Sequence, residues 1–231
     1  MIKKNLRQVF LDIETTGMNK YGCIYLNHKI IEIGIIETIN RKYTGRYIHY
    51  YLYPQRSIES SAYKIHGISE SFLSNKPTFK DIYKEIFNFI KNSEIIVHNS
   101  NFDISFLDYE FFLLNIGINK IKTFSTITDT LFIARKLFPG KKNNLDALCA
   151  RYKITNINRN FHSALLDAKI LMKLYMYMTS IQKEINFSRN YIKKIKIPKN
   201  FFKYYKKPLK IIFATKKENQ THLEYMKKII K

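Results

Sequence analysis

Runs of apolar residues bounded by turn-forming residues dominate the first quarter of the chain. The run RQVFLD (7–12) ends in an acid and leads into ETTG. KIIEIGIIETI (29–39) is rich in β-branched residues, and RYIHYYLY (46–53) stops at Pro54. Runs of this length and composition predict strands. We expect a buried first strand, with the other two forming an antiparallel ribbon beside it.

The next part of the chain predicts helices that alternate with strands. A loop is expected around Ala62 and His66, and apolar residues then recur three and four positions apart over 79–90, which predicts a helix. EIIV (94–97) predicts a short buried strand. Further helices are predicted over 101–115, 130–137, 144–152 and 163–177. Together these elements predict an α/β domain with a mixed sheet.

The sequence changes character near residue 183. Segment 183–208 is basic and aromatic, lacks an amphipathic period and contains Pro198 and Pro208, which is typical of a linker. The last stretch, 209–231, holds one apolar strand-like run and one possible helix, too little for a core of its own. We therefore expect one folded domain over 1–182, a basic linker over 183–208, and a tail over 209–231 that folds against a partner.

Lysine and arginine greatly outnumber the acids. The 231 residues include 40 Lys and Arg against 18 Asp and Glu, a formal charge of +22. This excess favours nucleic-acid binding, because basic side chains on phosphates release condensed counterions. The chain is also rich in Lys, Ile, Asn, Tyr and Phe and has no Trp, a bias typical of AT-rich genes. Charge alone leaves both explanations open.

The sequence predicts neither a membrane span nor a cysteine-based site. No window approaches the roughly 18 uninterrupted apolar residues of a span, and the N-terminus has no apolar run that predicts a secretory signal. Cys23 and Cys149 lie far apart and form no C-x-x-C motif, which argues against a zinc site and a disulfide framework. We expect a cytoplasmic protein.

Acidic residues gather at predicted strand ends and helix starts. Asp12 and Glu14 are two positions apart at the end of a strand, which places their side chains on one face. Asp103 lies where the chain enters a helix, and His162 is expected on the loop before the helix of Asp167. Each alone has an ordinary explanation, as a turn residue, a capping or first-turn acid, a surface histidine or a solvated acid. Together, hard oxygen ligands without cysteine suit Mg²⁺ or Mn²⁺, and two such ions about 3.5–4 Å apart promote phosphodiester hydrolysis.

Three motifs carry a resemblance to a known family. FLDIETTG (10–17), VHNSNFD (97–103) and HSALLD (162–167) resemble, in order and spacing, the motifs of the DEDD exonucleases of ribonuclease H-like fold, in the DEDDh subgroup whose last motif is H-x-x-x-x-D. Over about residues 7–179 the chain is similar to the proofreading subunits of bacterial replicative DNA polymerases. The resemblance implies a central mixed β-sheet flanked by helices, and metal-dependent removal of mismatched nucleotides from the 3′ end of DNA.

The resemblance also implies a role for each motif residue. Asp12 would bridge two divalent ions, Glu14 and Asp167 would complete the first site, and Asp103 would hold the second. His162 would act as the general base toward the attacking water, a task suited to histidine. The residues implied in binding the terminal nucleotide are Asp12, Glu14, Thr15, Thr16, Gly17, Met18, Ala62, Ile65, His66, Asn99, Phe102 and Asp167.

Segments after the catalytic domain resemble partner-binding peptides. QKEINF is similar to the family's clamp-binding peptide, with Gln182, Ile185 and Phe187 as anchors, although a helix end followed by a linker explains the same residues. Segment 209–230 resembles the C-terminal segment that docks on the polymerase (alpha) subunit, and a small accessory subunit, theta, is a further candidate partner. Linkers of relatives are polar and rich in Gln or Gly. This one is rich in Lys, Tyr and Ile, which leaves contact with DNA open.

Three other functions account for parts of the sequence. An RNA-trimming exonuclease of the same fold explains the motifs but not the tail, because such enzymes usually stop near the end of the catalytic domain. A non-catalytic polymerase scaffold explains the tail but not five intact site residues. A general basic DNA-binding module explains only the charge.

Overall fold

The computed structural model describes residues 6–118, 120–154, 161–180 and 213–229. The predicted clamp-binding residues Gln182, Ile185 and Phe187, and the predicted linker 183–208, lie outside the described residues. The chain divides into two compact units, Met1–Ile181 and Gln182–Lys231.

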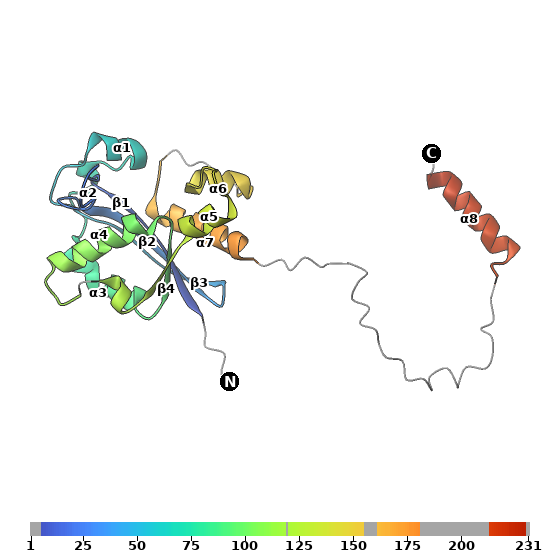
Figure 1. Ribbon diagram of the computed structural model, residues 1–231, viewed down its shortest axis with the longest axis horizontal. Coiled ribbons are helices and arrows are strands. Elements are labelled where there is room, and N and C mark those ends of the chain that lie inside the picture. Colours follow the sequence, from blue (N-terminus) through green and yellow to red (C-terminus); the bar gives the residue numbers. More distant parts are fainter. Residues whose placement is uncertain (1–5, 119, 155–160, 181–212, 230–231) are drawn as a thin grey trace, which may run out of the picture. The chain divides into compact units, whose positions relative to one another are not determined.

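The described strands of the first unit form one five-stranded mixed sheet (Figure 1). Antiparallel pairing joins β1 (Arg7–Thr15) to β2 (Ile30–Ile39), and β2 to β3 (Lys42–Tyr51). Parallel pairing adds β4 (Glu94–Val97) beside β1 and β5 (Thr126–Asp129) beside β4, in the order β3-β2-β1-β4-β5. The mixed sheet confirms the fold class predicted from the sequence.

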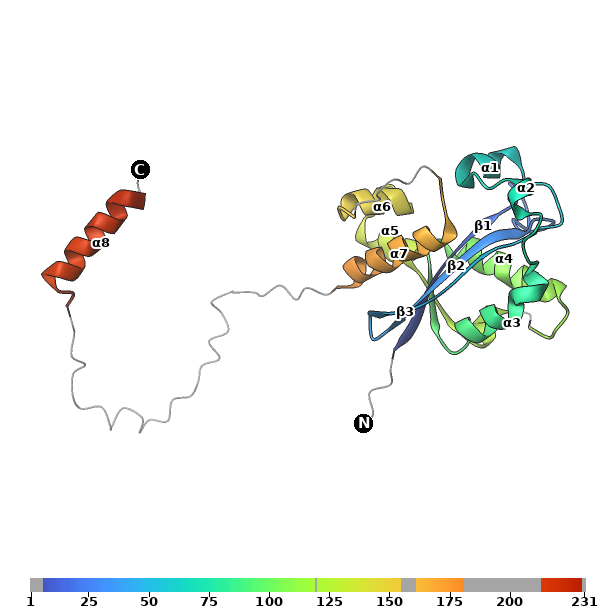
Figure 2. The same cartoon turned by 180° about the vertical axis from the view of Figure 1, so that it is seen from behind.

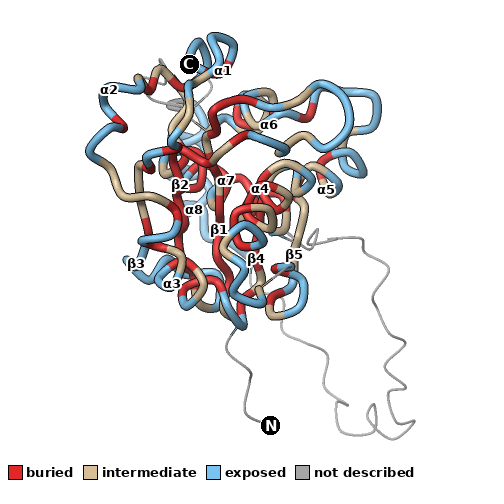
Figure 3. Tube along the Cα trace, turned by 90° about the vertical axis from the view of Figure 1, so that its left-hand side faces the viewer, coloured by how far each residue is buried: buried red, intermediate tan, exposed pale blue. Residues whose placement is uncertain are grey.

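Helices cover both faces of the sheet (Figures 1 and 2). On one face lie α3 (Phe79–Ile90) and α4 (Ser100–Leu113). On the other, α7 (Ala164–Thr179) packs with α5 (Thr130–Leu137) and α6 (Leu145–Arg151). Figure 3 shows the central strands β1 and β2 as mostly buried between these two layers.

Alternate residues of β1 face opposite helix layers. Val9 joins the core cluster that contains residues of α3 and α4, whereas Phe10 packs edge-on against Tyr175 of α7, with ring centroids 5.6 Å apart. Because side chains alternate along a strand, Asp12 and Glu14 lie on the same face as Phe10. Both acids therefore point toward the layer that contains α7.

Two short helices, α1 (Ser60–His66) and α2 (Glu70–Leu73), replace the loop that the sequence predicts around Ala62 and His66. With seven residues, α1 is too short to show a helical period in the sequence. It ends at Gly67, whose φ of 67° lies in the left-handed region that glycine adopts at helix ends. The prediction of a loop here is therefore wrong.

The longer predicted helices are confirmed, with small shifts at their ends. The caps Asn144 and Ser163 precede α6 and α7, and α5 has the predicted bounds. The third strand starts at Lys42 rather than at residue 46. The sequence did not predict β5, because TITD is short and partly exposed, or the 3-10 turn at Ile121–Thr123.

In the second unit the structure describes α8 (Lys216–Ile229), which is the helix predicted near the end of the chain. Its start is capped reciprocally. The N–H and hydroxyl of Thr215 donate to Glu218 Oε2 at 2.7 and 2.9 Å, and the Glu218 N–H donates to Thr215 Oγ1 at 3.3 Å. The side chains of Leu223 and Tyr225 are 60% and 62% exposed, so α8 offers apolar surface.

Within the described ranges, none of the helices has both the length and the apolar character needed to cross a membrane.

Candidate active site

A cavity of about 490 Å³ contains all five residues of the predicted catalytic set. They come from β1, from the first turn of α4, from the first turn of α7 and from the segment just before α7. The lining residues are Asp12, Ile13, Glu14, Thr15, Gly17, Met18, Lys20, Glu59, Ser61, Ala62, Ile65, His66, His98, Asn99, Phe102, Asp103, Leu145, His162 and Asp167. The fold thus brings together motifs that lie far apart in the sequence.

Glu14, His162 and Asp167 form a compact group in this cavity. Each offers one possible ligand atom, and these atoms lie within 4.8 Å of one another. His162 Nδ1 lies 3.6 Å from Asp167 Oδ2, with the histidine side chain 43% exposed and the aspartate 2% exposed. His162 lies before α7 and Asp167 lies inside it, as predicted, so the two side chains approach the cavity from different directions.

Asp103 is buried, with 2% of its surface exposed. Burial raises its pKa to about 8, although backbone N–H groups of Asp103 and Ile13 donate hydrogen bonds that oppose this shift. A nearby positive charge favours the ionised form of a carboxylate. A divalent cation in the cavity would therefore keep Asp103 ionised at neutral pH.

The donors in the cavity suit hard divalent cations. Five carboxylates line it, Asp12, Glu14, Glu59, Asp103 and Asp167, and its described lining includes no cysteine. Carboxylate oxygens are the preferred protein ligands of hard cations, whereas thiolates favour softer metals. The residues present fit the divalent ions that the sequence predicts.

Asp129, at the end of β5, holds the segment that leads to Asp103. Its carboxylate accepts hydrogen bonds from the N–H groups of Asn99 at 3.1 Å and Ser100 at 3.0 Å, and from the Ser100 hydroxyl at 2.9 Å. Burial raises the pKa of Asp129, but these hydrogen bonds and one from the Leu131 N–H outweigh burial and hold the pKa below its usual value. The carboxylate thus stays ionised and fixes the start of α4.

The turn after β1 lies directly against α1. Gly17 has φ +141°, a backbone conformation that favours glycine. Its Cα lies close to the Glu59 side chain, because a Cβ added to Gly17 would lie 2.5 Å from Glu59 Oε2. The Glu59 N–H donates to the Thr16 carbonyl at 2.9 Å, and the Thr15 hydroxyl donates to the Gly17 carbonyl at 3.0 Å. These contacts bring the ETTG turn and α1 to the same side of the cavity.

Of the residues predicted to bind the nucleotide, only Thr16 does not line the cavity. Thr16 is fully buried, and its hydroxyl oxygen accepts from the Lys29 N–H at 3.0 Å. Thr16 therefore holds the ETTG turn against the segment before β2, on the side away from the cavity. Met18 and Ile65 are 55% and 51% exposed, so they offer apolar surface at the cavity.

Six lining residues were not predicted from the sequence: Ile13, Lys20, Glu59, Ser61, His98 and Leu145. His98 directly precedes Asn99 in the motif VHNSNFD, which was the available signal. Its Nδ1 lies 2.9 Å from Thr130 Oγ1, and burial lowers its pKa. Burial likewise lowers the pKa of His66, whose Nδ1 accepts from the Ile68 N–H at 3.0 Å. Both histidines are therefore neutral at pH 7.

Comparison with known sequences matches the domain that contains this cavity. The family model described as exonuclease (RNase_T) matches residues 9–175. The chain is 56% identical over 229 residues to DNA polymerase III subunit epsilon of Buchnera aphidicola subsp. Schizaphis graminum (strain Sg), covering 96% of each chain. It is 51% identical over 182 residues to DNA polymerase III subunit epsilon of Escherichia coli (strain K12), covering 79% of this chain and 75% of that one.

Solved nuclease structures share the fold. The nuclease domain of 3′hExo, a DEDDh family member bound to rAMP, aligns with a TM-score of 0.63 over 76% of this chain and 92% of that one, at 15% identity. Exonuclease X in complex with 5′ overhanging duplex DNA aligns with a TM-score of 0.54 over 75% and 90% of the two chains, at 24% identity. At these identities the likeness shows the fold alone.

Proposed function

The chain belongs to the exonuclease family, and from that premise we propose that it is the proofreading subunit of a DNA polymerase III, a 3′→5′ exonuclease that removes mismatched nucleotides from DNA. The observation that carries the proposal is the arrangement of Glu14, His162 and Asp167, whose possible ligand atoms lie within 4.8 Å of one another. Asp12 and Asp103 line the same cavity. The presence of all five residues in one cavity supports hydrolysis of this type.

Two divalent ions, Mg²⁺ or Mn²⁺, are the proposed cofactors. The side chains that would hold them are Asp12, Glu14, Asp103 and Asp167, all of which line the cavity. When bound, such ions supply positive charge that favours ionisation of water and stabilises the leaving oxygen.

His162 accepts the proton of the attacking water in the proposed mechanism. Its side chain is 43% exposed beside the buried carboxylate of Asp167, so it is accessible to water and adjacent to a negative charge that stabilises the imidazolium. The water oxygen bonds to phosphorus while the bond between phosphorus and the preceding nucleotide's 3′ oxygen breaks. That oxygen gains a proton, which gives a nucleoside 5′-monophosphate and a shortened strand with a 3′-hydroxyl.

Selection of mismatches follows from the need for an unpaired end. A paired terminal nucleotide must first be unstacked and unpaired, at a cost of a few kcal/mol that is smaller for a mismatch. The apolar side chains of Met18 and Ile65, which are 55% and 51% exposed, provide a surface for the released nucleotide. The site therefore prefers mismatched ends without recognising the wrong base.

The proposed partners contact three parts of the chain. Tail 209–231 binds the alpha subunit, for which the exposed apolar side chains of α8 provide contact area. Gln182, Ile185 and Phe187 bind the sliding clamp, theta binds the exonuclease domain, and segment 183–208 serves as the linker.

Degradation of a 5′-labelled DNA primer, paired or mismatched at its 3′ end, tests the proposed function. The wild type should remove the mismatched nucleotide with Mg²⁺ or Mn²⁺ but not with EDTA, and Asp12→Ala should abolish this. Glu85→Gln, which neutralises an exposed carboxylate outside the cavity, is the matched control and should keep full activity. Cleavage of RNA but not DNA would favour RNA trimming, and cleavage of neither would favour a scaffold.

A further inference from the structure

Glu32 is a buried carboxylate next to the catalytic set that does not line the cavity. It lies on β2, is 1% exposed, and is the register partner of Glu14 across the antiparallel pair β1–β2. Residues opposite one another in such a pair have side chains on the same face of the sheet. Glu32 therefore faces α7, as Glu14 does. Because burial of a carboxylate is costly unless it is well paired, its contacts indicate what it does.

The Glu32 carboxylate joins β3 to the start of α7. Its Oε1 lies 2.8 Å from His49 Nε2 and accepts a hydrogen bond from the Ser163 hydroxyl at 2.9 Å. Tyr51 lies on the same side, and burial together with the negative charge of Glu32 raises the pKa of its phenol. Ser163 is the residue directly after His162 in the chain.

Ser163 does not use its side chain as an N-cap serine usually does. It occupies the N-cap position of α7, but its hydroxyl makes no capping hydrogen bond to the helix. A serine cap ordinarily stabilises a helix, so α7 forgoes that contribution here. The hydroxyl instead binds Glu32 at 2.9 Å, which fixes the start of α7 to β2.

A second contact joins the backbone of His162 to α1. The His162 N–H donates to the carbonyl of Ile65 in α1 at 3.1 Å. His162 is thus held by its own backbone on one side and by the Ser163 side chain on the other. A side chain between two such anchors loses freedom to move relative to Asp167 in the first turn of α7.

We propose that Glu32 is a positioning residue for hydrolysis: through the Ser163 hydroxyl it fixes the backbone of His162, so that the imidazole faces Glu14 and Asp167. The inference rests on the proposed function, in which His162 accepts the proton from water. Groups that orient catalytic side chains affect turnover more than substrate binding.

Steady-state kinetics of the full chain on single-stranded DNA, and on the p-nitrophenyl ester of thymidine 5′-phosphate, test this role. Ser163→Ala and Glu32→Ala each remove one partner of the hydrogen bond, and each should lower kcat by about 10- to 100-fold and change KM by less than about twofold. Ser163→Thr retains the hydroxyl and should retain most of kcat. If Glu32→Ala fails to fold, the Ser163 variants alone decide the outcome.

The matched control is Ser69→Ala. Ser69 caps α2 in the usual way, by accepting from the Phe72 N–H at 3.2 Å, and it does not line the cavity. This variant should lower the melting temperature without changing kcat. An equal loss of kcat in Ser69→Ala and Ser163→Ala would overturn the proposal, because a general loss of stability would then explain both.

A double-mutant cycle with His162→Ala separates the positioning role from the proposed function. If Ser163 acts through His162, Ser163→Ala should change the residual kcat of His162→Ala by less than about twofold. An undiminished effect in that background would overturn the positioning role while leaving His162 as the base. Full activity of His162→Ala would overturn both. If His162→Ala is inactive and Ser163→Ala retains wild-type kcat, the inference alone fails.

Discussion

Gly34 of β2 lies directly against Leu165 of α7: a Cβ added to Gly34 would lie 2.4 Å from the Leu165 backbone nitrogen. The close approach, and not an unusual φ, requires glycine at this position. Because α7 also carries Asp167, the contact sets the position of this buried carboxylate of the cavity relative to the sheet.

Gly34→Ala should therefore destabilise the exonuclease domain and lower its activity. The added methyl group would force α7 away from β2, and overpacking of this kind costs about 1–3 kcal/mol. Urea unfolding and primer degradation measure the two effects. In an unhindered strand, alanine is more stable than glycine by about 0.5–1 kcal/mol. A variant as stable as the wild type would show that the contact between β2 and α7 leaves room for a methyl group at this position.

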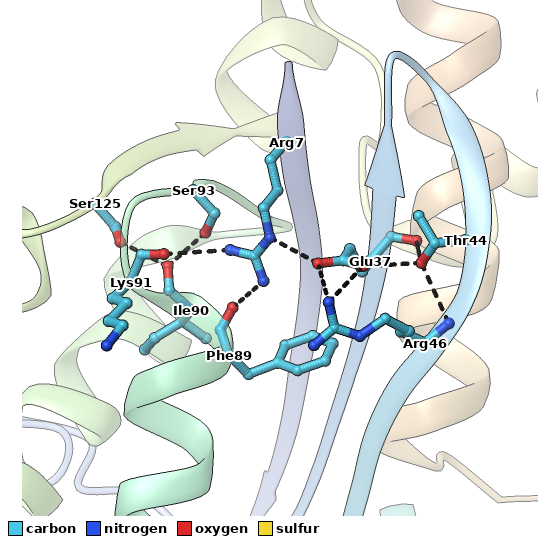
Figure 4. Close-up of polar contacts among 9 residues, drawn as sticks. All are labelled: Arg7, Glu37, Thr44, Arg46, Phe89, Ile90, Lys91, Ser93 and Ser125. Carbon is cyan, nitrogen blue, oxygen red and sulfur yellow. Dashed lines mark hydrogen bonds and ion pairs between the residues drawn. The ribbon is translucent and has the colours of Figure 1, made fainter. Parts of the chain in front are cut away.

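Arg7 lies at the start of β1, the end of the strand away from the cavity, and connects the sheet to α3 (Figure 4). Its Nε donates to Glu37 Oε1 at 2.6 Å, and its other nitrogens donate to the carbonyls of Phe89 at 2.5 Å and Lys91 at 3.2 Å. Arg46 donates to the same carboxylate at 3.3 Å from the solvent side. The Glu37 side chain is 1% exposed and the Arg46 side chain 65% exposed.

Arg7→Ala should lower the free energy of unfolding much more than Arg46→Ala does. Loss of Arg7 removes the closest cation from the buried Glu37 carboxylate, which then keeps only the Thr44 hydroxyl and the more distant Arg46 as donors, and it also removes the Arg7 hydrogen bonds to two carbonyls. Breaking a buried ion pair of this kind costs about 3 kcal/mol. Arg46→Ala removes an exposed ion pair worth about 1 kcal/mol or less. Urea unfolding of both variants checks the difference. Equal losses would mean that the two arginines share the stabilisation of Glu37.

Residue order and strand periodicity predicted which edge of the sheet carries the carboxylates of the proposed catalytic set. Asp12 and Glu14 alternate with buried residues at the end of β1, and Asp103 follows the adjacent parallel strand, so both groups had to lie near one edge of the sheet. His162 and Asp167 completed the set through their motif spacing.

The supporting residues could not be predicted in this way, because their roles depend on register and tertiary contact. Nothing in KIIEIGIIETI shows that Glu32 lies opposite Glu14 or reaches Ser163, 131 positions farther along the chain. The sequence of α1 has too few apolar positions to predict a helix. Contacts with Thr16 and His162 hold the two ends of this helix in the folded protein. Local patterns predicted the elements but not the contacts between them.

Asp103→Asn should stabilise the metal-free protein at alkaline pH while it abolishes hydrolysis. Burial raises the pKa of Asp103 to about 8 in the folded protein, whereas an unfolded chain has about 3.9. Between these values the folded state binds more protons, so the stability of the wild type falls as pH rises from about 4 to about 8. Asparagine does not titrate, so the free energy of unfolding of the variant should not fall in this way as pH rises.

Urea unfolding in EDTA at several pH values between 5 and 8.5 measures the effect. The stability advantage of Asp103→Asn should grow steadily with pH, and Mg²⁺ should stabilise the wild type more than the variant at pH 8. Parallel stability curves for the two proteins would refute the prediction.

Removal of residues 209–231 should leave nuclease activity intact and abolish binding to the alpha subunit. The five residues of the proposed catalytic set all belong to the unit that ends at Ile181. Primer degradation and a binding assay with purified alpha subunit measure the two properties. An inactive truncation would show that the tail belongs to the catalytic fold.

Lys20 should contribute to DNA binding through its charge. It is the one lysine or arginine among the described lining residues of a cavity that is otherwise rich in carboxylates. DNA phosphates are repelled by those carboxylates, so a cation at this position should attract the strand that enters. Each phosphate neutralised by a lysine contributes about 0.7 to the slope of log affinity against log salt concentration for single strands.

Lys20→Gln should therefore raise KM for single-stranded DNA at low salt, reduce the salt slope of log KM by about 0.7, and leave kcat nearly unchanged. Lys64→Gln is the matched control, because Lys64 is an exposed lysine of α1 that does not line the cavity. Kinetics between 25 and 200 mM salt, about one decade, separate the two variants. If both change KM equally, overall positive charge attracts the substrate; if only Lys20→Gln does, one cation at the cavity offsets the repulsion between its carboxylates and DNA.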